Sequence, residues 1–402
     1  MMPADNVQVE PNTGWRPRRV ARASAPLLFG YGAYGAYWGA WAVMFAEYLA
    51  QRGLSLAAAG GLFSLTSITA IATMTLIGGP AVRLPRPAAL AGAFALTTAG
   101  SMAIGLAEGA GMPPAFALLG VGIGLVDVLV NLVGSEIEAA ARRPVLQLVH
   151  AAYGLGGGVA ALLTAVAVSH DVSVTQVLMA MSLLQLVAGV LCWVLVEHVP
   201  PQAYDQSAGL ALRVLRGRPD LIAVAVIVLC AFFIEGSMDV WSVLFVRTDL
   251  GGHVLGAAAA FAAFAAAITV GRLFAAQVLF GLGYERTLVI SAAGSVVASV
   301  LLVTAGSTFA AGGAFLMLGF FLSVAAPAAF GHVGADARSG NVGVAAVTAV
   351  GYGGFVIGPP ALGWVADSLG LRPALAALVV AAVCMLVAAL VGRARVNPRA
   401  ER

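Results

Sequence analysis

The chain has 402 residues, of which 61% are hydrophobic and 10% are charged, whereas a typical soluble domain carries about 25% charged residues. A soluble fold of this size needs more polar residues to cover its exposed faces. The composition therefore excludes an ordinary soluble enzyme, a disordered chain and a secreted disulfide scaffold. It indicates a helical membrane protein with many spans.

The basic and cysteine residues exclude several further classes of protein. All 21 basic residues are arginine, so a phosphate-binding GxxxxGK[ST] loop and lysine Schiff-base chemistry are both impossible. Any pumping must draw on a gradient or on a partner subunit. Cys192, Cys230 and Cys384 lie in apolar runs without a CxxC pair, which argues against a disulfide framework and a zinc site. We expect no cofactor and no metal, and we attribute the net charge of +3 to membrane topology rather than to a nucleic-acid partner.

Apolar runs of membrane-spanning length recur throughout the chain. A helix of about 20 residues crosses the hydrocarbon core at 1.5 Å per residue, and the runs are too long and too uniform for barrel strands. The sequence predicts an all-α membrane protein with twelve spans. They lie near residues 25–50, 57–80, 87–107, 112–138, 144–169, 172–197, 220–247, 254–280, 286–306, 308–332, 340–364 and 371–393.

The placement of arginine predicts the orientation of these spans. When the loops are assigned alternately to the two sides, seventeen of the 21 arginines fall on the side of the termini. Arg52, Arg247 and Arg372 fall on the other side, and Arg272 lies within the eighth span. Basic residues are enriched in cytoplasmic loops. We therefore expect a multi-pass protein of the cell inner membrane with both termini in the cytoplasm.

The chain divides into two halves of similar length. A cytoplasmic linker at 198–219 separates a six-helix bundle at 25–197 from a second one at 220–393. Within the linker, residues 208–216 form either a short helix on the membrane surface or solvated chain. Cytoplasmic tails at 1–24 and 394–402 complete the division. The sequence GLGG at 154–157 recurs as GYGG at 351–354. A repeated pattern at a half-length offset indicates duplicated bundles, as in many secondary transporters.

Ionisable residues within the spans are candidate functional sites, because burying charge in hydrocarbon costs several kcal/mol. Asp127 lies near the middle of the fourth span, with Asn131 one helical turn away. His150 lies at a similar depth across the hairpin to the fifth span. The three residues are predicted to form one polar cluster. In it Asp127 and His150 carry or relay a proton and Asn131 lines the substrate cavity, unless the cluster only locks two helices together.

Two acids lie one turn apart in the seventh span. Glu235 and Asp239 should not both ionise in a low dielectric, so the pair is expected to titrate together and hold a proton. A proton-coupled carrier needs such a group. The alternative is that a partner from the first half neutralises one of the two.

Two other charged residues are expected at gates or in structural pairs. Glu47 lies near the outer end of the first span, where its side chain can reach water. Arg272 follows Gly271 in the eighth span and is expected to pair with a gate or a helix end rather than with substrate.

The first span also carries an aromatic stripe at helical spacing, formed by Tyr34, Trp38, Trp41, Phe45 and Tyr48. Aromatic faces stack on flat or sugar-like solutes, so Tyr34, Trp38 and Trp41 are predicted to line a substrate cavity. The alternative is packing against lipid or neighbouring helices.

Several longer motifs resemble a known family. They are GVGIGLVDVLVN at 120–131, RP at 143–144, HAAYGLGGG at 150–158, IEGSMDVWS at 234–242, RTDLG at 247–251, GYGGFVIGPP at 351–360 and GWVADSLGLR at 363–372. Together they resemble a bacterial branch of the major facilitator superfamily near the fucose-permease-like transporters.

The resemblance implies two pseudo-symmetric six-helix bundles around a central cavity, which rock to give alternating access. It also implies gradient-driven and commonly proton-coupled transport. Carried over by position, the pathway residues are Asp127, Asn131, His150, Glu235 and Tyr352.

The chain also departs from the family pattern. The loop at 78–86 keeps its arginines but lacks the expected acid, and Ala275 and Ala276 stand where an aspartate is expected after the eighth span. In the seventh span Val240 replaces the acid expected directly before Trp241, and Asp239 lies one position earlier.

These observations predict a secondary active transporter that moves a small organic solute by proton symport and that acts as a monomer in the lipid bilayer. One alternative is a proton-driven efflux antiporter for amphipathic compounds, and another is a membrane sensor or assembly subunit that does not transport. An enzyme is not expected, because the sequence carries no nucleophile–base pair or metal set.

Overall fold

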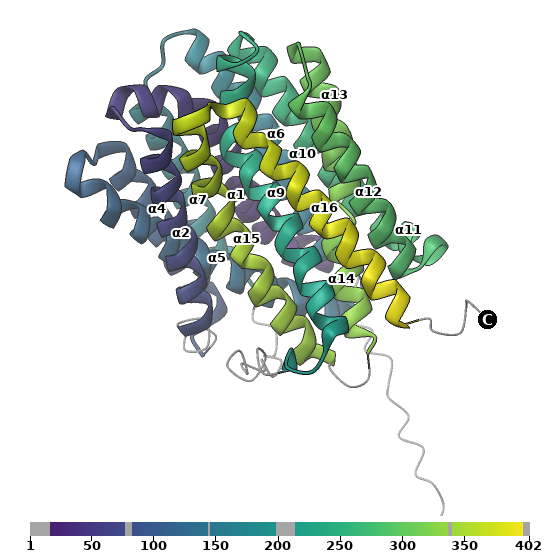
Figure 1. Ribbon diagram of the computed structural model, residues 1–402. Coiled ribbons are helices and arrows are strands. Elements are labelled where there is room, and N and C mark those ends of the chain that lie inside the picture. Colours follow the sequence, from purple (N-terminus) through teal and green to yellow (C-terminus); the bar gives the residue numbers. More distant parts are fainter. Residues whose placement is uncertain (1–16, 77–82, 144, 198–213, 337–339, 397–402) are drawn as a thin grey trace, which may run out of the picture.

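The computed structural model describes residues 17–76, 83–143, 145–197, 214–336 and 340–396, and within these ranges the regular structure is entirely helical (Figure 1). The loop at 78–82, most of the linker at 198–219 and the ends of both tails lie outside these ranges. The first half contains α1 (Pro17–Arg52), α2 (Leu56–Leu76), α4 (Arg86–Leu106), η1 (Gly109–Gly111), α5 (Met112–Ala141), α6 (Leu146–Ser169) and α7 (Val174–Leu195). The second half contains α9 (Pro219–Thr248), α10 (Val254–Leu273), α11 (Ala275–Leu282), α12 (Tyr284–Val303), α13 (Thr308–Leu322), α14 (Ala325–Gly334), α15 (Gly340–Leu369) and α16 (Leu371–Val396).

The helices match the predicted spans closely. Eleven segments of the described chain are long and apolar enough to cross a membrane, and they correspond to the second to twelfth predicted spans. The first span corresponds to α1, whose 36 residues exceed the length that a membrane requires. Helix α1 begins at Pro17 rather than near residue 25, so part of the predicted tail is helical. Arg19 on its first turns pairs with Glu197 at a distance of 3.3 Å.

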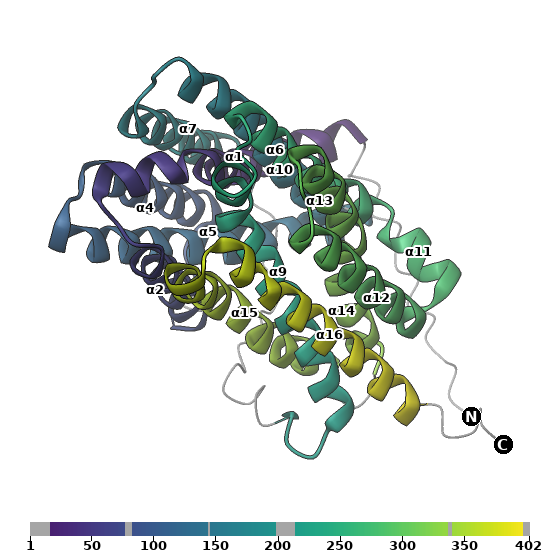
Figure 2. The same cartoon turned by 45° about the horizontal axis from the view of Figure 1, so that its top comes forward.

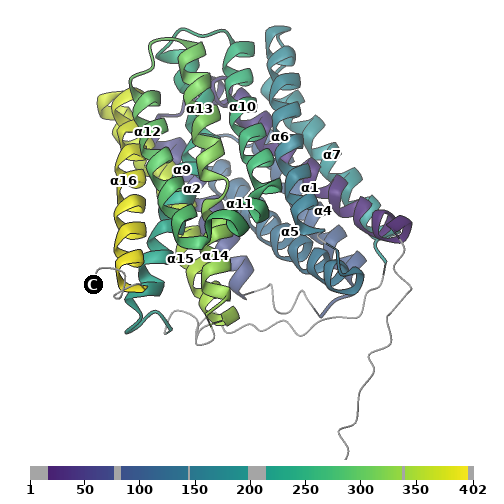
Figure 3. The same cartoon turned by 90° about the vertical axis from the view of Figure 1, so that its right-hand side faces the viewer.

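The packing of the helices repeats between the halves. Helix α1 packs on α6 as α9 packs on α15, and α4 packs on α7 as α12 packs on α16. The halves meet where α2 packs on α15 and where α6 packs on α10, with α1 against α9 between these two contacts. Figures 2 and 3 show the two groups of helices side by side, and in Figure 3 α6 of the first half lies next to α10 of the second.

Glycine permits the closest of these helix contacts. A Cβ atom on Gly39 of α1 would lie 1.9 Å from the carbonyl oxygen of Gly157 on α6. A Cβ atom on Gly354 of α15 would lie 2.3 Å from the carbonyl oxygen of Leu229 on α9. Gly157 and Gly354 hold the same position in the repeated motif. Within the motif a Cβ atom would come closest to the neighbouring backbone at Gly156 in the first copy, 2.1 Å from Gly32 O, and at Gly354 in the second. Both copies therefore permit close contacts, at different positions, as small residues do in membrane helices generally.

The contact between α2 and α15 depends on two consecutive prolines. Pro359 and Pro360 lie inside α15 and lack the N–H groups that would bond the carbonyls four residues earlier. Those two carbonyls accept hydrogen bonds from α2 instead. The Ser67 hydroxyl donates to Phe355 O at 3.3 Å, and the Ser64 hydroxyl donates to Val356 O at 2.6 Å.

A carboxylate of α15 caps the start of α2, at the end of the α2–α15 contact that lies farthest from the chain termini. Asp367, near the end of α15, accepts the backbone N–H of Leu56 at 2.8 Å and that of Ala57 at 3.1 Å. These are free donors of the first turn of α2, where a helix favours negative charge. An acid from one half therefore caps a helix of the other half.

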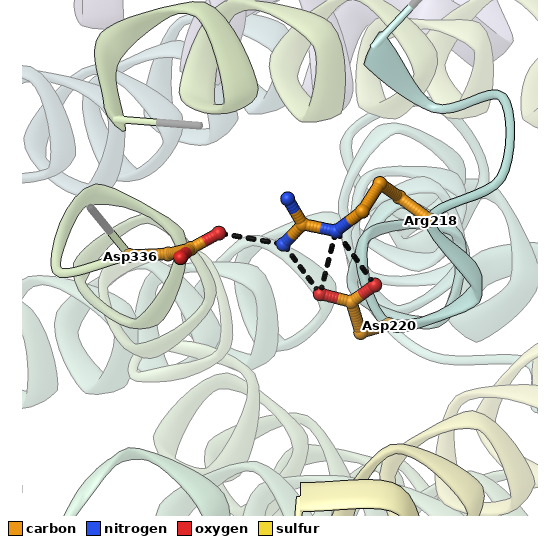
Figure 4. A network of polar contacts seen from close by, with 3 residues as sticks. All are labelled: Arg218, Asp220 and Asp336. Carbon is orange, nitrogen blue, oxygen red and sulfur yellow. Dashed lines mark hydrogen bonds and ion pairs between the residues drawn. The ribbon is translucent and has the colours of Figure 1, made fainter. Parts of the chain in front are cut away.

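On the side of the termini, a charged network fixes the start of the second half. Arg218 directly precedes α9, and its Nη2 donates to Asp220 at 2.7 Å and to Asp336 after α14 at 2.5 Å (Figure 4). The hydrogen bonds that the Arg218 guanidinium donates to Asp220 and Asp336 raise its pKa. All three side chains are partly exposed. The network therefore orients the chain more than it stabilises the fold.

The α1–α6 contact predicts the effect of adding one methyl group. Gly39→Ala would place Cβ against a backbone carbonyl, and such overpacking costs about 1–3 kcal/mol. We expect the midpoint of thermal unfolding in detergent to fall by several degrees. Gly61→Ala is the matched control, because no atom lies within 4 Å of its Cβ position. Equal midpoints for the two variants would contradict the packing described here.

The cap on α2 predicts a local change in hydrogen exchange. In Asp367→Ala the N–H groups of Leu56 and Ala57 lose a charge-assisted acceptor of about 1.5–3 kcal/mol, so their exchange should be at least about tenfold faster by mass spectrometry. Asp249→Ala is the control, because Asp249 accepts the Arg372 N–H within the second half. Unchanged exchange at the start of α2 in Asp367→Ala would show that the cap does not hold the two halves together.

Candidate functional site

Asp127 lies between the two halves and accepts a tyrosine hydroxyl from each. Tyr31 on α1 donates to Oδ1 at 2.8 Å, and Tyr352 on α15 donates to Oδ2 at 2.7 Å. Both carboxylate oxygens are therefore bonded in this arrangement, and one carboxylate connects the first half to the second. Tyr352 was carried over from the family resemblance, whereas Tyr31 was not singled out by the sequence.

Asn131 and His150 extend this contact within the first half. Asn131 Nδ2 donates to the backbone carbonyl of Asp127 at 2.8 Å and lies 3.4 Å from its Oδ1. His150 Nε2 lies 3.1 Å from Asn131 Oδ1, so it donates when that nitrogen carries the proton. The structure therefore brings the three residues together at the hairpin depth expected from the sequence. A polar chain runs from His150 through Asn131 and Asp127 to Tyr352.

A second charged cluster lies on α9 and α10. Arg272 Nη2 lies 2.9 Å from Glu235 Oε1 and 3.1 Å from Oε2. The partner of Glu235 therefore comes from its own half and not from the first half. Arg272 lies in the last turn of α10 and borders the same cavity as Glu235. Asp239, one turn along α9, has no hydrogen bond or ion pair within the described part of the chain.

Both clusters border one central cavity of about 30 Å³, which is room for about one water molecule. His150 borders it from the first cluster, and Glu235, Asp239 and Arg272 border it from the second. The remaining lining residues are aromatic, small or apolar: Gly35, Trp38, Gly39, Tyr153, Gly154, Gly157, Phe261, Phe264, Ala265, Ile268 and Thr269.

The aromatic stripe of α1 is divided between the cavity and the core. Trp38 borders the cavity. Tyr34 lies one layer behind, with its ring centroid 5.5 Å from that of Tyr153. Trp41 is only 1% exposed and packs against Phe63 and Phe116. The structure therefore places Trp41 in the core of the first half, which agrees with the packing alternative.

Glu47 and Arg247 form an ion pair at the end of the molecule away from the chain termini. Glu47 Oε1 lies 2.5 Å from Arg247 Nη1, which joins α1 to α9. Both residues border a second cavity of about 730 Å³. This larger cavity contains none of the residues around Asp127, so the central cavity is the better candidate for a coupled binding site.

Comparison with known proteins identifies the family. The profile of the Major Facilitator Superfamily matches residues 27–352. An uncharacterized MFS-type transporter of Yersinia pestis is 28% identical over 269 residues, covering 65% of this chain and 67% of that protein. An uncharacterized transporter of Sinorhizobium fredii is 27% identical over 275 residues, covering 65% of this chain and 71% of that protein.

Solved structures share the fold at low sequence identity. A bacterial homologue of the human lysosomal transporter Spinster, in an inward-facing and unoccupied conformation, has a TM-score of 0.77 at 15% identity, covering 94% of this chain and 98% of that one. The nucleoside transporter NupG has a TM-score of 0.71 at 15% identity, covering 93% and 99%. The match lies at the level of the superfamily, so the fucose-permease-like branch stays a prediction. The helical fold, the membrane-spanning segments and the profile match together show that this chain belongs to the major facilitator superfamily, whose members are transporters and not enzymes.

Proposed function

We propose that this chain is a proton-coupled secondary active transporter that moves a small organic solute across the cell inner membrane by alternating access. The observation that carries the proposal is the position of Asp127, which accepts one hydroxyl from each half of the molecule. The excess of arginine on the side of the termini supports cytoplasmic termini.

Protonation of Asp127 would change how firmly the halves are joined. The ionised carboxylate accepts two charge-assisted hydrogen bonds, which are stronger than neutral ones. A proton on Oδ2 makes that oxygen a donor and weakens its bond to Tyr352. Because Tyr352 belongs to the second half, proton uptake would loosen one contact between the halves. This links a proton to the rocking motion that alternating access requires.

Asn131 and His150 would act as positioning residues for Asp127. His150 holds the amide oxygen of Asn131, which keeps the Asn131 Nδ2 group directed at Asp127. His150 also borders the central cavity. A solute in that cavity could therefore reach the proton site through a short polar chain.

Symport is the simplest scheme when the proton and the solute bind to different groups. Here the proton would bind Asp127 and the solute would bind in the central cavity.

A specific observation favours proton-driven antiport as a second candidate. Asp239 borders the cavity without a partner among the described residues, so a proton and a solute could compete for it. The sign of the proton flux distinguishes the two schemes.

The proposal predicts that Asp127→Asn separates solute movement from proton coupling. A solute that binds the chain would first be identified by a thermal-shift screen of a solute library at two pH values. The Glu235→Gln variant would be screened alongside. In proteoliposomes, Asp127→Asn should keep the rate of solute exchange within about threefold of that of the original chain. Its proton-driven accumulation of solute should fall at least about tenfold, which corresponds to about 1.36 kcal/mol. Tyr352→Phe keeps the acid and should reduce accumulation less.

Glu108→Gln is the matched control, because Glu108 is exposed and pairs only with Arg52 among the described residues. Full proton-driven accumulation by Asp127→Asn would end the proposed role of Asp127. Binding without flux under any imposed gradient would favour a sensor. A pH-sensitive dye inside the vesicles would report proton entry with the solute for symport and proton exit for antiport.

A further inference from the structure

We propose that the central cavity takes an organic cation, whose ammonium group faces Asp239. This inference rests on the proposed transport function, because it assigns a chemical class to the solute of the same site.

One carboxylate at the cavity has no hydrogen bond or ion pair among the described residues. Arg272 makes both of its short contacts with Glu235, so these two charges neutralise each other. Asp239 borders the same cavity and has no hydrogen bond or ion pair within the described part of the chain. Glu235 and Arg272 are the charges nearest to it and offset each other. A carboxylate in an enclosed site without a hydrogen bond or ion pair of its own is unfavourable unless a proton or another cation neutralises it. The cavity therefore favours a positive occupant.

The walls of the cavity fit the same class of solute. Trp38, Tyr153, Phe261 and Phe264 line it from three different helices, and aromatic faces attract ammonium groups, most strongly where water is excluded. The remaining lining is mostly glycine, alanine and isoleucine, which provides few side-chain donors for an anion. The guanidinium of Arg272 is already bonded to Glu235. An anionic solute would have to displace Glu235 and would also meet Asp239.

The position of the cavity explains how a solute larger than water would enter. The lining residues belong to α1, α6, α9 and α10, and these helices form the contacts α1–α9 and α6–α10 between the halves. Separation of the halves would widen the cavity and bring both Asp239 and the aromatic walls into contact with the entering solute. In the arrangement described here its volume is about 30 Å³, so a solute larger than water requires the halves to separate first.

The test uses probes of matched shape and different charge on the full chain in nanodiscs. The cations are choline and benzyltrimethylammonium. The neutral carbon isostere of choline is 3,3-dimethylbutan-1-ol, and the anion of similar shape is 3,3-dimethylbutanoate. Titration calorimetry should show saturable binding of at least one cation, at least tenfold weaker binding of the neutral isostere and no binding of the anion. Quenching of tryptophan fluorescence should accompany cation binding, because Trp38 borders the site.

Variants then assign the binding to Asp239. Asp239→Asn should weaken cation binding at least tenfold, and Asp239→Glu should restore most of it because the charge is kept. Glu108→Gln should bind as the original chain does. Unchanged thermal unfolding and a single peak in size-exclusion chromatography would show that each variant is folded.

Different results overturn different proposals. Failure of every cation to bind, equal binding by Asp239→Asn, or binding of the anion in place of the cations overturns the assignment of solute class. Proton-driven flux of a neutral or anionic solute overturns it too, but leaves the proposed function intact. Cation binding that depends on Asp239 without flux under any gradient supports the assignment of the site and contradicts the transport function.

Discussion

The structure depends on how buried charge is satisfied inside an apolar molecule. An ionised carboxylate in such surroundings needs hydrogen-bond donors or a cation, and the helix backbone has none to spare away from its first turn. Asp127 finds its donors on two helices from different halves, and Glu235 finds its cation on the neighbouring helix. Because the donors of Asp127 come from both halves, its protonation and the relative position of the halves are coupled in the proposed mechanism.

The two halves have the same internal packing but different polar residues. The repeated glycine motif permits close contacts of α6 and of α15 with their neighbours, although at different positions of the motif. The tyrosine within the second copy of the motif, Tyr352, reaches Asp127, whereas Leu155 stands at its place in the first copy. The two halves thus share a helix packing, and single side chains at equivalent positions make them chemically different.

The sequence predicted the elements and some of the contacts for clear physical reasons. Long apolar runs predict membrane helices because the bilayer sets their length, and the spacing of Asn131 and His150 around a short turn predicted their approach. It did not predict the contacts between distant helices. The partner of Glu235, the burial of Trp41 and the cap provided by Asp367 depend on which helices become neighbours, and one sequence does not contain that information. Helix α1 also begins before the predicted span, because arginines near a helix end can extend into the polar interface.

The two prolines of α15 have a consequence for hydration. In an uninterrupted helix every carbonyl before the last turn is bonded within the helix, so two such helices can part along their length without exposing unsatisfied backbone. The carbonyls of Phe355 and Val356 have no donor in their own helix and rely on serine hydroxyls of α2. When those helices separate, only water can replace the serines at an acceptable free energy. Opening along this line must therefore wet it, which makes the balance between the two arrangements sensitive to the activity of water.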